Sequence, residues 1–240
     1  NTLFWDTDQR RYVDGMSKEG VLSGHSSLHA NAFPLAMGLV PPERVGDVLA
    51  FIRTKGLCCN LFLAQFLFEA LYDYGAADYA HSLLLDPGPE SPMQMVRRGA
   101  TTTWEAWDLD QKWNTSLFHP AGAFTGYIIG SRLMGVTPLE PGFARIKIKP
   151  QVGPLSWARI RVPTLRGAIE LSVCQQPGTR FRLDVRLPSN SSGEVWLPLP
   201  QNEQARVLLD GQVHPYTEND GWAVLASVEA GRHVCEVEVS

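Results

Sequence analysis

The hydrophobic positions along the chain change their period near residue 136. Before that point, apolar residues recur every three or four positions over stretches that are broken by Gly or Pro. This spacing is typical of amphipathic helices, and the short breaks favour antiparallel neighbours. The predicted helices cover residues 26–38, 41–56, 60–74, 78–85, 93–98 and 116–134.

Local signals support these bounds. Ser26 or Ser27 can cap the first helix, and Pro41 and Pro42 suit the first turn of the second. The third helix, 60–74, is apolar nearly all round and should therefore be buried on most sides. Ahead of the helices, the first 24 residues are extended, aromatic and acidic. They predict a loop or short hairpin with a turn at residues 14–15, an Asp-Gly pair.

After residue 136 the pattern becomes that of strands. Residues 137–142 are rich in turn formers and predict a connector, whereas 144–149 alternates strictly between apolar and polar positions. Similar runs follow, several of them separated by Gly-containing turns. The predicted strands cover residues 144–149, 157–162, 167–175, 180–187, 194–199, 205–209, 212–216, 222–226 and 232–239. We therefore expect a helical domain over 1–136 and an antiparallel β-sandwich over 137–240.

Composition narrows the classes of partner. The chain has 240 residues, of which 44% are hydrophobic and 19% charged, enough for one large or two modest domains. The net charge of −4 and the pI near 5.9 provide no electrostatic basis for binding nucleic acid or an anionic membrane. The apolar run 57–71 contains Asn60, Gln65 and Glu69, so it predicts a buried helix and not a membrane span.

The start of the chain and its cysteines leave the compartment open between cytoplasmic and secreted. The chain begins at Asn1 without a basic-then-apolar leader, so we expect no signal peptide in it and a fragment or processed product. Cys58 and Cys59 are adjacent and cannot sensibly bridge each other. Cys174 and Cys235 lie in predicted strands and could form a disulfide if those strands pair, although free thiols are favoured in a chain of this size.

The segment 99–119, GATTTWEAWDLDQKWNTSLFH, carries the candidate chemistry and is called the Trp-rich segment below. It holds three of the seven Trp together with acidic residues and a histidine. Sugar rings present apolar C–H faces that suit indoles and hydroxyls that suit carboxylates and imidazoles, so this mixture indicates a carbohydrate site. Its candidate residues are Trp104, Glu105, Trp107, Asp108 and His119.

An alternative for the same segment is structural. The tryptophans would then be core anchors and the acids would solvate a loop, since Trp is usually well buried. The order Thr-Thr-Trp-Glu-Ala-Trp weakens this alternative. In an extended chain Thr103 and Glu105 share one face and Trp104 and Ala106 the other, which places the carboxylate beside aromatic walls.

Other candidates have simpler interpretations. His25 and His29 are four residues apart, as in a metal pair, but no acidic third ligand is recognisable nearby, so no metal or cofactor is expected. Trp5 and Trp157 are expected to pack within the structure. Most tryptophans in strands are core residues, so the same is expected of two more in the sandwich, Trp196 and Trp222.

Several motifs together resemble bacterial α-L-rhamnosidases of glycoside hydrolase family 78. The resemblance covers nearly the whole chain, and its most specific pieces are TTTWEAW and the ordered pattern GV-TP-PGF-I-I-P. The motifs are HSSLHANAFPLAMGLVP, FLFEALYDYG, GATTTWEAWD, SLFH, LMGVTPLEPGFARIKIKPQVGPLSWARIRVPTLRGAI and RLPSN.

The resemblance implies part of a catalytic (α/α)6 toroid followed by a β-sandwich, and inverting hydrolysis of terminal α-L-rhamnosides. The family's general base falls on Glu105 and a sugar-contacting histidine on His119. The substrate would be a rhamnose-containing glycoside or polysaccharide. The family's general acid lies in the first half of the toroid, and only about six of its twelve or so helices are readable here. We therefore expect the C-terminal part of such an enzyme, or a short relative.

Three questions follow for the structure. The acids Asp6, Glu69, Asp108 and Asp110 are alternative partners for Glu105, although for Glu69 a structural hydrogen bond to a neighbouring backbone or side chain is favoured. A non-catalytic carbohydrate-binding or structural fragment is the alternative function. Helix faces that the missing half would cover also predict self-association or docking onto the other half of the barrel.

Overall fold

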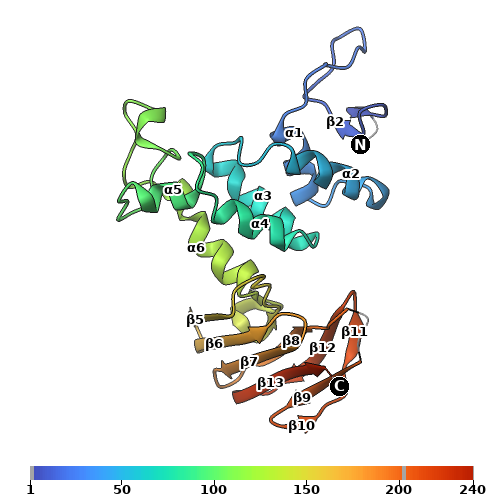
Figure 1. The fold of residues 1–240 in the computed structure, drawn as a ribbon, viewed down its shortest axis with the longest axis vertical. Helices are drawn as coiled ribbons and strands as arrows, with labels where there is room; N and C mark the ends of the chain where they lie inside the picture. The colour runs from blue at the N-terminus through green and yellow to red at the C-terminus, as the bar shows by residue number, and fades with distance from the viewer. Residues whose placement is uncertain (1–2, 202–203, 240) are drawn as a thin grey trace. The chain divides into compact units, whose positions relative to one another are not determined.

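The computed structural model describes residues 3–201 and 204–239 and consists of two compact units, residues 1–128 and 129–240 (Figure 1). The first unit is helical apart from a small hairpin, and the second contains two packed β-sheets. None of the described helices is long and apolar enough to cross a bilayer.

A short hairpin opens the helical unit. Strand β1 (Trp5–Asp6) pairs antiparallel with β2 (Arg11–Tyr12). The Asp6 carboxylate accepts hydrogen bonds from two backbone N–H groups within the turn, which stabilises it as an Asx turn does. A hairpin is thus present, but its turn lies between β1 and β2 and not at residues 14–15. The Asp14 carboxylate instead accepts a hydrogen bond from the Ser27 N–H at the start of the first helix.

The predicted helices form with shifts of a few residues at their ends. They are α1 (Leu28–Ala36), α2 (Pro42–Arg53), α3 (Leu61–Asp73), α4 (Ala77–Leu84) and α5 (Pro92–Arg97). Side-chain oxygens of Ser27, Asn60 and Ser91 each accept a backbone hydrogen bond from the first turn of α1, α3 and α5. Backbone N–H groups in the first turn of a helix have no acceptor within the helix. Prolines occupy such positions in α2 and α5, and since proline has no N–H, no donor is left unbonded there.

Helix α3 lies at the centre of the helical unit and contacts α1, α4 and the helix α6 (Phe124–Ile128) (Figure 1). Eight of its 13 residues are buried, as its nearly uniform hydrophobicity predicts. Each fully buried Leu, such as Leu67, stabilises the fold by about 1.5–3 kcal/mol. Among the large apolar side chains of α3, Phe62 is the one that is mostly exposed, with 64% of its surface open to solvent.

The last predicted helix, 116–134, begins later than expected and is irregular. A 3₁₀ helix η2 (Pro120–Ala123) leads into α6, and a π-helix η3 (Ile129–Leu133) follows as the first element of the second unit. Residues 116–119 are not helical because their backbone pairs with residues 103–105 of the Trp-rich segment. That pairing is a contact between distant positions, which helical periodicity does not report.

The second unit is a β-sandwich, as predicted. One sheet has the strand order β10-β9-β13-β7-β6-β5 and the other β11-β12-β8-β4-β3, and neighbouring strands are antiparallel except for β4 with β8, which are parallel. The bounds of the strands are β3 (Val136–Pro138), β4 (Arg145–Ile148), β5 (Trp157–Thr164), β6 (Gly167–Gln176), β7 (Arg180–Leu187), β8 (Ser192–Pro198), β9 (Ala205–Leu209), β10 (Gln212–Val213), β11 (Thr217–Asn219), β12 (Trp222–Val228) and β13 (Gly231–Val239).

Two parts of the sandwich differ from the prediction. Of the predicted strand 212–216 only residues 212 and 213 form a strand, β10, and Pro215 beyond it has no N–H to donate to a ladder. The next strand, β11, begins at residue 217 and belongs to the other sheet. In addition, β3 lies where a connector was expected. Its approach to β4 depends on Gly135, since a Cβ at that position would lie 2.0 Å from the Lys149 carbonyl oxygen.

Alternate residues of both sheets meet in one core. Fully buried residues include Ile146 and Ile148 of β4, Val195 and Leu197 of β8, and Val173 of β6. The strict alternation of these strands in the sequence therefore predicts their inward faces correctly.

The sandwich tryptophans correct three expectations. Trp157 is 71% exposed at the start of an edge strand, and so it does not pack within the structure. Trp196 and Trp222 are half-buried and alternate with core residues, which places them on the outer face of their sheet. Lys149 lies over both rings, 4.9 and 4.7 Å from the centroids. Cation–π contacts with lysine replace core packing here.

The four cysteines are free thiols, as favoured from the sequence. A Cys174–Cys235 disulfide is excluded by the strand order, because β7 lies between β6 and β13. Cys235 is buried, and burial raises the pKa of its thiol to about 12.

Candidate functional site

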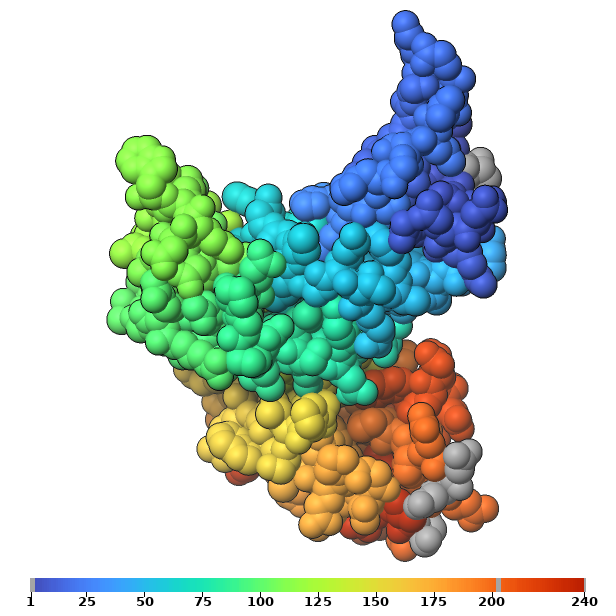
Figure 2. Space-filling view, turned by 45° about the horizontal axis from the view of Figure 1, so that its top comes forward, coloured from blue at the N-terminus to red at the C-terminus, as the bar shows by residue number. Residues whose placement is uncertain are grey.

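The two ends of the Trp-rich segment lie side by side. The Glu105 N–H donates to the Ser116 carbonyl at 2.9 Å, and the His119 N–H donates to the Thr103 carbonyl at 2.8 Å. The Thr103 hydroxyl returns a hydrogen bond to the His119 carbonyl at 2.9 Å. These bonds bring the predicted base and the predicted sugar-binding histidine onto neighbouring stretches of backbone. In Figure 2 the segment, in light green, projects from the rest of the helical unit.

A glycine allows this arrangement to pack onto the helices. At Gly122, in η2, an added Cβ would lie 2.7 Å from the Thr103 Cβ and 2.9 Å from the Trp104 carbonyl oxygen. Real Cβ atoms do not approach backbone oxygen that closely, so only Gly fits at this point without displacement of the segment. Gly122 therefore allows the close approach of η2 to residues 103 and 104.

Glu105 is held as an ionised carboxylate. The Lys112 ammonium lies 2.5 Å from one carboxylate oxygen, and the Ser116 N–H donates to the other at 3.1 Å. The hydrogen bond from Lys112, together with that from Ser116 and the nearby His119, lowers the pKa of Glu105 below its usual value. The side chain remains 28% exposed, and each oxygen has a further lone pair. A carboxylate in this state can accept a proton from water.

His119 presents a hydrogen-bond donor. Its Nδ1 accepts a hydrogen bond from the Ala121 N–H at 3.2 Å, so in the neutral imidazole the proton resides on Nε2. The exposed ring of Phe62 meets the imidazole edge-on, with centroids 6.1 Å apart and planes at 87°. An apolar ring beside an N–H donor is a combination that suits a sugar.

Asp108 is ionised but engaged. The Gln94 amide donates to one oxygen at 2.6 Å, the Asp110 N–H donates to the other at 3.3 Å, and Arg98 lies 3.3 Å away. The Gln94 hydrogen bond, with smaller contributions from the Asp110 N–H and Arg98, lowers the pKa of Asp108. Its side chain is only 14% exposed and caps the short 3₁₀ helix η1 (Leu109–Gln111). Asp108 thus connects α5 to the Trp-rich segment.

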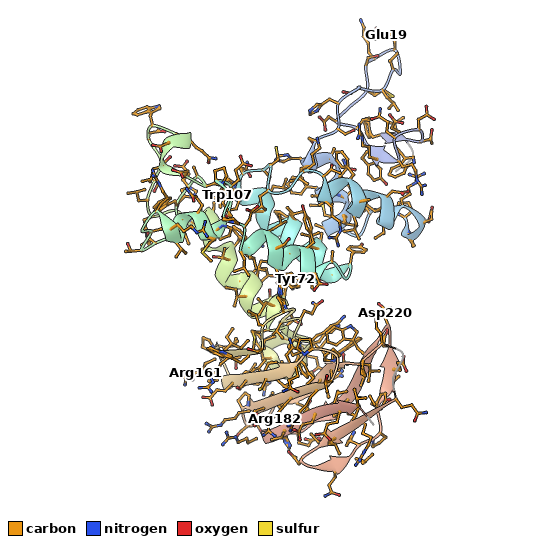
Figure 3. All side chains as sticks on the ribbon, viewed as in Figure 1. Glu19, Tyr72, Trp107, Arg161, Arg182 and Asp220 are labelled. Carbon is orange, nitrogen blue, oxygen red and sulfur yellow. The ribbon has the colours of Figure 1, made fainter. Side chains whose placement is uncertain are left out.

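Two of the three tryptophans of the segment are buried. Trp104 is 4% exposed and Trp107 3%. The Trp107 indole N–H donates to the Cys59 carbonyl at 2.7 Å, and its ring meets Phe124 edge-on at 6.3 Å. Trp107 is labelled in Figure 3. Trp113, in contrast, is 95% exposed. The two buried indoles leave little surface for direct contact with a ligand and instead fix the backbone on either side of Glu105.

The remaining candidates lie apart from this arrangement. Glu69 accepts a hydrogen bond from Gln65 within α3 at 3.0 Å, which confirms its structural interpretation. The imidazole of His25 pairs with Asp14, whereas His29 contacts Phe33. Within residues 3–201 and 204–239, no group of three or more His, Cys, Asp or Glu side chains is arranged to hold a metal ion.

Sequence reasoning missed the residues that control the charges of the site. Lys112, Gln94 and Arg98 lie in none of the quoted motifs, and Ser116, although part of SLFH, was not singled out. Each acts through a contact that depends on how the segment folds back. The one available signal was the density of cations and amides flanking the acids, which does not identify partners.

Two family descriptions match the chain. The bacterial alpha-L-rhamnosidase 6 hairpin glycosidase domain matches residues 7–130, and the bacterial alpha-L-rhamnosidase C-terminal domain matches residues 135–211. Among curated proteins, an alpha-L-rhamnosidase of Streptomyces avermitilis is 28% identical over 204 residues, which cover 79% of this chain and 19% of that protein.

Solved structures show the same fold. The alpha-L-rhamnosidase from Dictyoglumus thermophilum has a TM-score of 0.84 at 24% identity, covering 99% of this chain and 27% of that one. The Streptomyces avermitilis enzyme, solved as a complex with L-rhamnose, has a TM-score of 0.77 at 25% identity, covering 94% and 23%. This chain spans about a fifth of the length of the curated relatives it matches. Its helices are thus part of a six-hairpin toroid, as predicted.

Proposed function

Because the chain belongs to the bacterial α-L-rhamnosidase family, we propose that it supplies the general-base part of a glycoside hydrolase that cleaves terminal α-L-rhamnosides with inversion. The substrate is a rhamnose-containing glycoside or polysaccharide. Residues 1–136 provide part of the catalytic barrel, and residues 137–240 the accompanying β-sandwich. The observation that carries this proposal is the ionised Glu105 carboxylate beside the imidazole of His119.

The reaction needs two carboxyl groups on opposite sides of the sugar. One is ionised and removes a proton from water, whose oxygen attacks the anomeric carbon, while a protonated one donates to the departing glycosidic oxygen. Glu105 suits the first role, since Lys112 and the Ser116 N–H favour its charged form. Once Glu105 has taken the proton of the water, its attraction to Lys112 weakens. The ion pair between Glu105 and Lys112 forms again when Glu105 releases this proton to solvent.

His119 and its neighbours position the sugar. The Nε2–H of His119 donates to a rhamnose hydroxyl, and the exposed Phe62 ring contacts an apolar face of the sugar. Trp104 and Trp107 form the hydrophobic wall that supports the segment, and Asp108 holds it to α5. These residues act on binding, so their loss should change KM as well as kcat.

The general acid requires a raised pKa, because it must remain protonated until it donates. Asp108 has a lowered pKa, which makes it unsuited to this role. Asp110 is paired with Arg98 at 3.1 Å and its side chain is 86% exposed, so it does not lie in an enclosed site beside Glu105. We therefore place the acid on a residue beyond this chain, in agreement with the resemblance.

The decisive experiment replaces Glu105 with Gln in whichever form of the protein, this chain or a longer one that contains it, hydrolyses an aryl α-L-rhamnoside. Loss of a general base lowers kcat by a factor on the order of 10²–10⁴. Glu69→Gln is the matched control, because Glu69 is a partly buried glutamate that is hydrogen bonded to Gln65 within α3. The turnover of this variant should stay within about twofold of wild type. Near-normal turnover of Glu105→Gln removes Glu105 from the mechanism. NMR of the first product tests inversion.

A non-catalytic carbohydrate-binding role is the second candidate. It is favoured by the engagement of both oxygens of Glu105 and Asp108 in hydrogen bonds, as in a structural or binding site. Under this candidate the protein binds L-rhamnose in calorimetry but no form of it turns over substrate. Measuring binding and turnover on the same preparation separates the two functions.

We also propose that further protein covers part of the helical unit in the active form, either a second copy or the rest of the barrel. Large apolar side chains are strongly exposed there, among them Val96 at 64% and Phe118 at 83%. Exposed apolar surface of this kind marks association sites. Light scattering that finds these 240 residues alone to be a monomer, with full activity on an aryl α-L-rhamnoside, would contradict this.

A further inference from the structure

The outer face of the six-stranded sheet carries a shallow groove that has no part in the proposed reaction. Its volume is about 960 Å³, and it lies across β5, β6, β7 and β13. Residues pointing the other way, such as Leu171 and Val185, are buried in the core. The charged residues of the groove are Arg159, Arg161, Glu170, Asp184, Arg186 and Arg232.

The charges in this groove are not balanced. Glu170 is shared between Arg161, at 3.3 Å, and Arg186, at 3.7 Å. Asp184 is already neutralised by both arms of the Arg182 guanidinium, at 2.9 and 3.0 Å (Figure 3 labels Arg161 and Arg182).

Arg159 and Arg232 form no ion pair with any acidic residue in the described part of the chain. Both side chains are exposed. A chain with a net charge of −4 therefore presents two uncompensated guanidinium groups on one face.

An exposed aromatic ring adjoins these cations. Trp157, Arg159 and Arg161 are alternate residues of β5, so their side chains leave the same face of the sheet. At about 3.3 Å per residue, this row is roughly 13 Å long. Perpendicular to this row, Arg161, Glu170, Arg186 and Arg232 are cross-strand neighbours on β5, β6, β7 and β13. At about 4.8 Å between adjacent strands, these four residues span about 14 Å. The indole of Trp157 is 71% exposed, a large apolar surface in contact with water.

We propose that this groove binds a saccharide chain that carries carboxylate or sulfate groups. The flat indole of Trp157 stacks against the C–H face of one sugar ring, Arg159 binds an anionic group close to that ring, and Arg232 binds one further along the saccharide chain. Guanidinium is suited to this because its planar fork donates two parallel hydrogen bonds to a carboxylate or sulfate. The groove is shallow and open along the sheet, which fits an extended chain and not a small enclosed ligand. Binding in this groove uses no residue of the proposed catalytic machinery and does not depend on hydrolysis.

Calorimetry on the full chain tests the proposal with four probes. These are oligogalacturonides, which carry carboxylates, sulfated dextran oligosaccharides, unmodified dextran oligosaccharides and a single-stranded oligonucleotide. We expect binding to at least one of the two anionic saccharides, weaker at high salt, and none to the neutral one. Binding to one or to both distinguishes carboxylate from sulfate recognition.

Variants locate the site. Arg159→Ser/Arg232→Ser should weaken binding at least tenfold, and Trp157→Ala at least fivefold. The matched control Lys18→Ser/Arg206→Ser removes the same charge from exposed positions outside the groove and should stay within twofold. Because all these side chains are exposed, far-UV circular dichroism should remain unchanged.

Several results would overturn the proposal. They are no binding of either anionic saccharide by the wild type, equal binding of unmodified dextran, tighter binding of the oligonucleotide, or equal losses in groove and control variants. An unchanged affinity in Trp157→Ala would show a simple anion site and refute stacking of a sugar. Glu105→Gln should leave binding intact, so failure here is distinguishable from failure of the proposed catalytic role.

Discussion

The ammonium group of Lys112 lies 2.5 Å from a carboxylate oxygen of Glu105, within the same loop and seven residues further along the chain. It is the largest contribution to the lowered pKa of that carboxyl. A strongly favoured anion is available at low pH but is a weaker base, because basicity falls with pKa. Lys112 therefore sets a compromise between the fraction of Glu105 that is ionised and its power to remove a proton from water.

Lys112→Met should move the acidic limb of the pH–kcat/KM profile to higher pH. Removing the cation raises the pKa of Glu105 toward its ordinary value, so a larger fraction of the enzyme is protonated and inactive under acidic conditions. Near pH 7 the carboxylate stays ionised in both proteins, and turnover should be equal or higher in the variant. The pH dependence of hydrolysis of an aryl α-L-rhamnoside measures this shift.

Lys18→Met is the control for that profile, since Lys18 is exposed and paired only with its neighbour Glu19. Its acidic limb should coincide with the wild type. A Lys112→Met profile that also coincides would mean that Glu105 is not the group titrating on the acidic side.

Gly122→Ala should destabilise the helical unit. The added methyl group would meet Thr103 at 2.7 Å and the Trp104 carbonyl at 2.9 Å, so the segment bearing Glu105 must shift. Overpacking of this kind costs about 1–3 kcal/mol of the free energy of unfolding. Activity should fall further than stability alone explains, because the base is displaced by the same movement.

Gly126→Ala separates this clash from a general effect of adding a methyl group. Gly126 lies in α6, and an added Cβ there would have no neighbour within 4 Å. Alanine favours a helix over glycine by about 0.5–1 kcal/mol, so this variant should be neutral or slightly stabilised in urea unfolding. Equal stabilities for the two variants would contradict the close approach of η2 to the Trp-rich segment.

Periodicity and turn chemistry predict the framework of this protein because both report local geometry. Prolines in the first turns and the alternation of 144–149 place helices and strands within a few residues of their observed bounds. The same signals fail where distant residues decide. The pairing of Ser116 with Glu105 keeps residues 116–119 out of a helix, and nothing in the local sequence indicates it.

The site is predicted in its parts but not in its contacts. Glu105 and His119 were identified from a motif, and the backbone pairing brings their chain segments together. The burial of Trp107 and the exposure of Trp157 depend on whether a layer of protein lies over each ring. A tryptophan has the same intrinsic preference in both places, so its environment follows only from the tertiary fold.

Trp107→Phe tests whether the buried indole supports the site. The substitution keeps an aromatic ring against Phe124 but removes the N–H that donates to the Cys59 carbonyl at 2.7 Å. A buried carbonyl left without its donor costs about 1–3 kcal/mol, and because this bond is partly buried, urea unfolding should show a loss at the lower end of that range. Trp113→Phe is the matched control, because Trp113 is 95% exposed in the same segment and its replacement should change stability by less than about 0.5 kcal/mol.

Since Trp107 follows Glu105 by two residues, loosening it should also lower kcat, whereas Trp113→Phe should leave kcat unchanged. If the two variants unfold at the same urea concentration as the wild type, Trp107 does not anchor the segment, and the position of Glu105 must then depend on Lys112 and Ser116 alone.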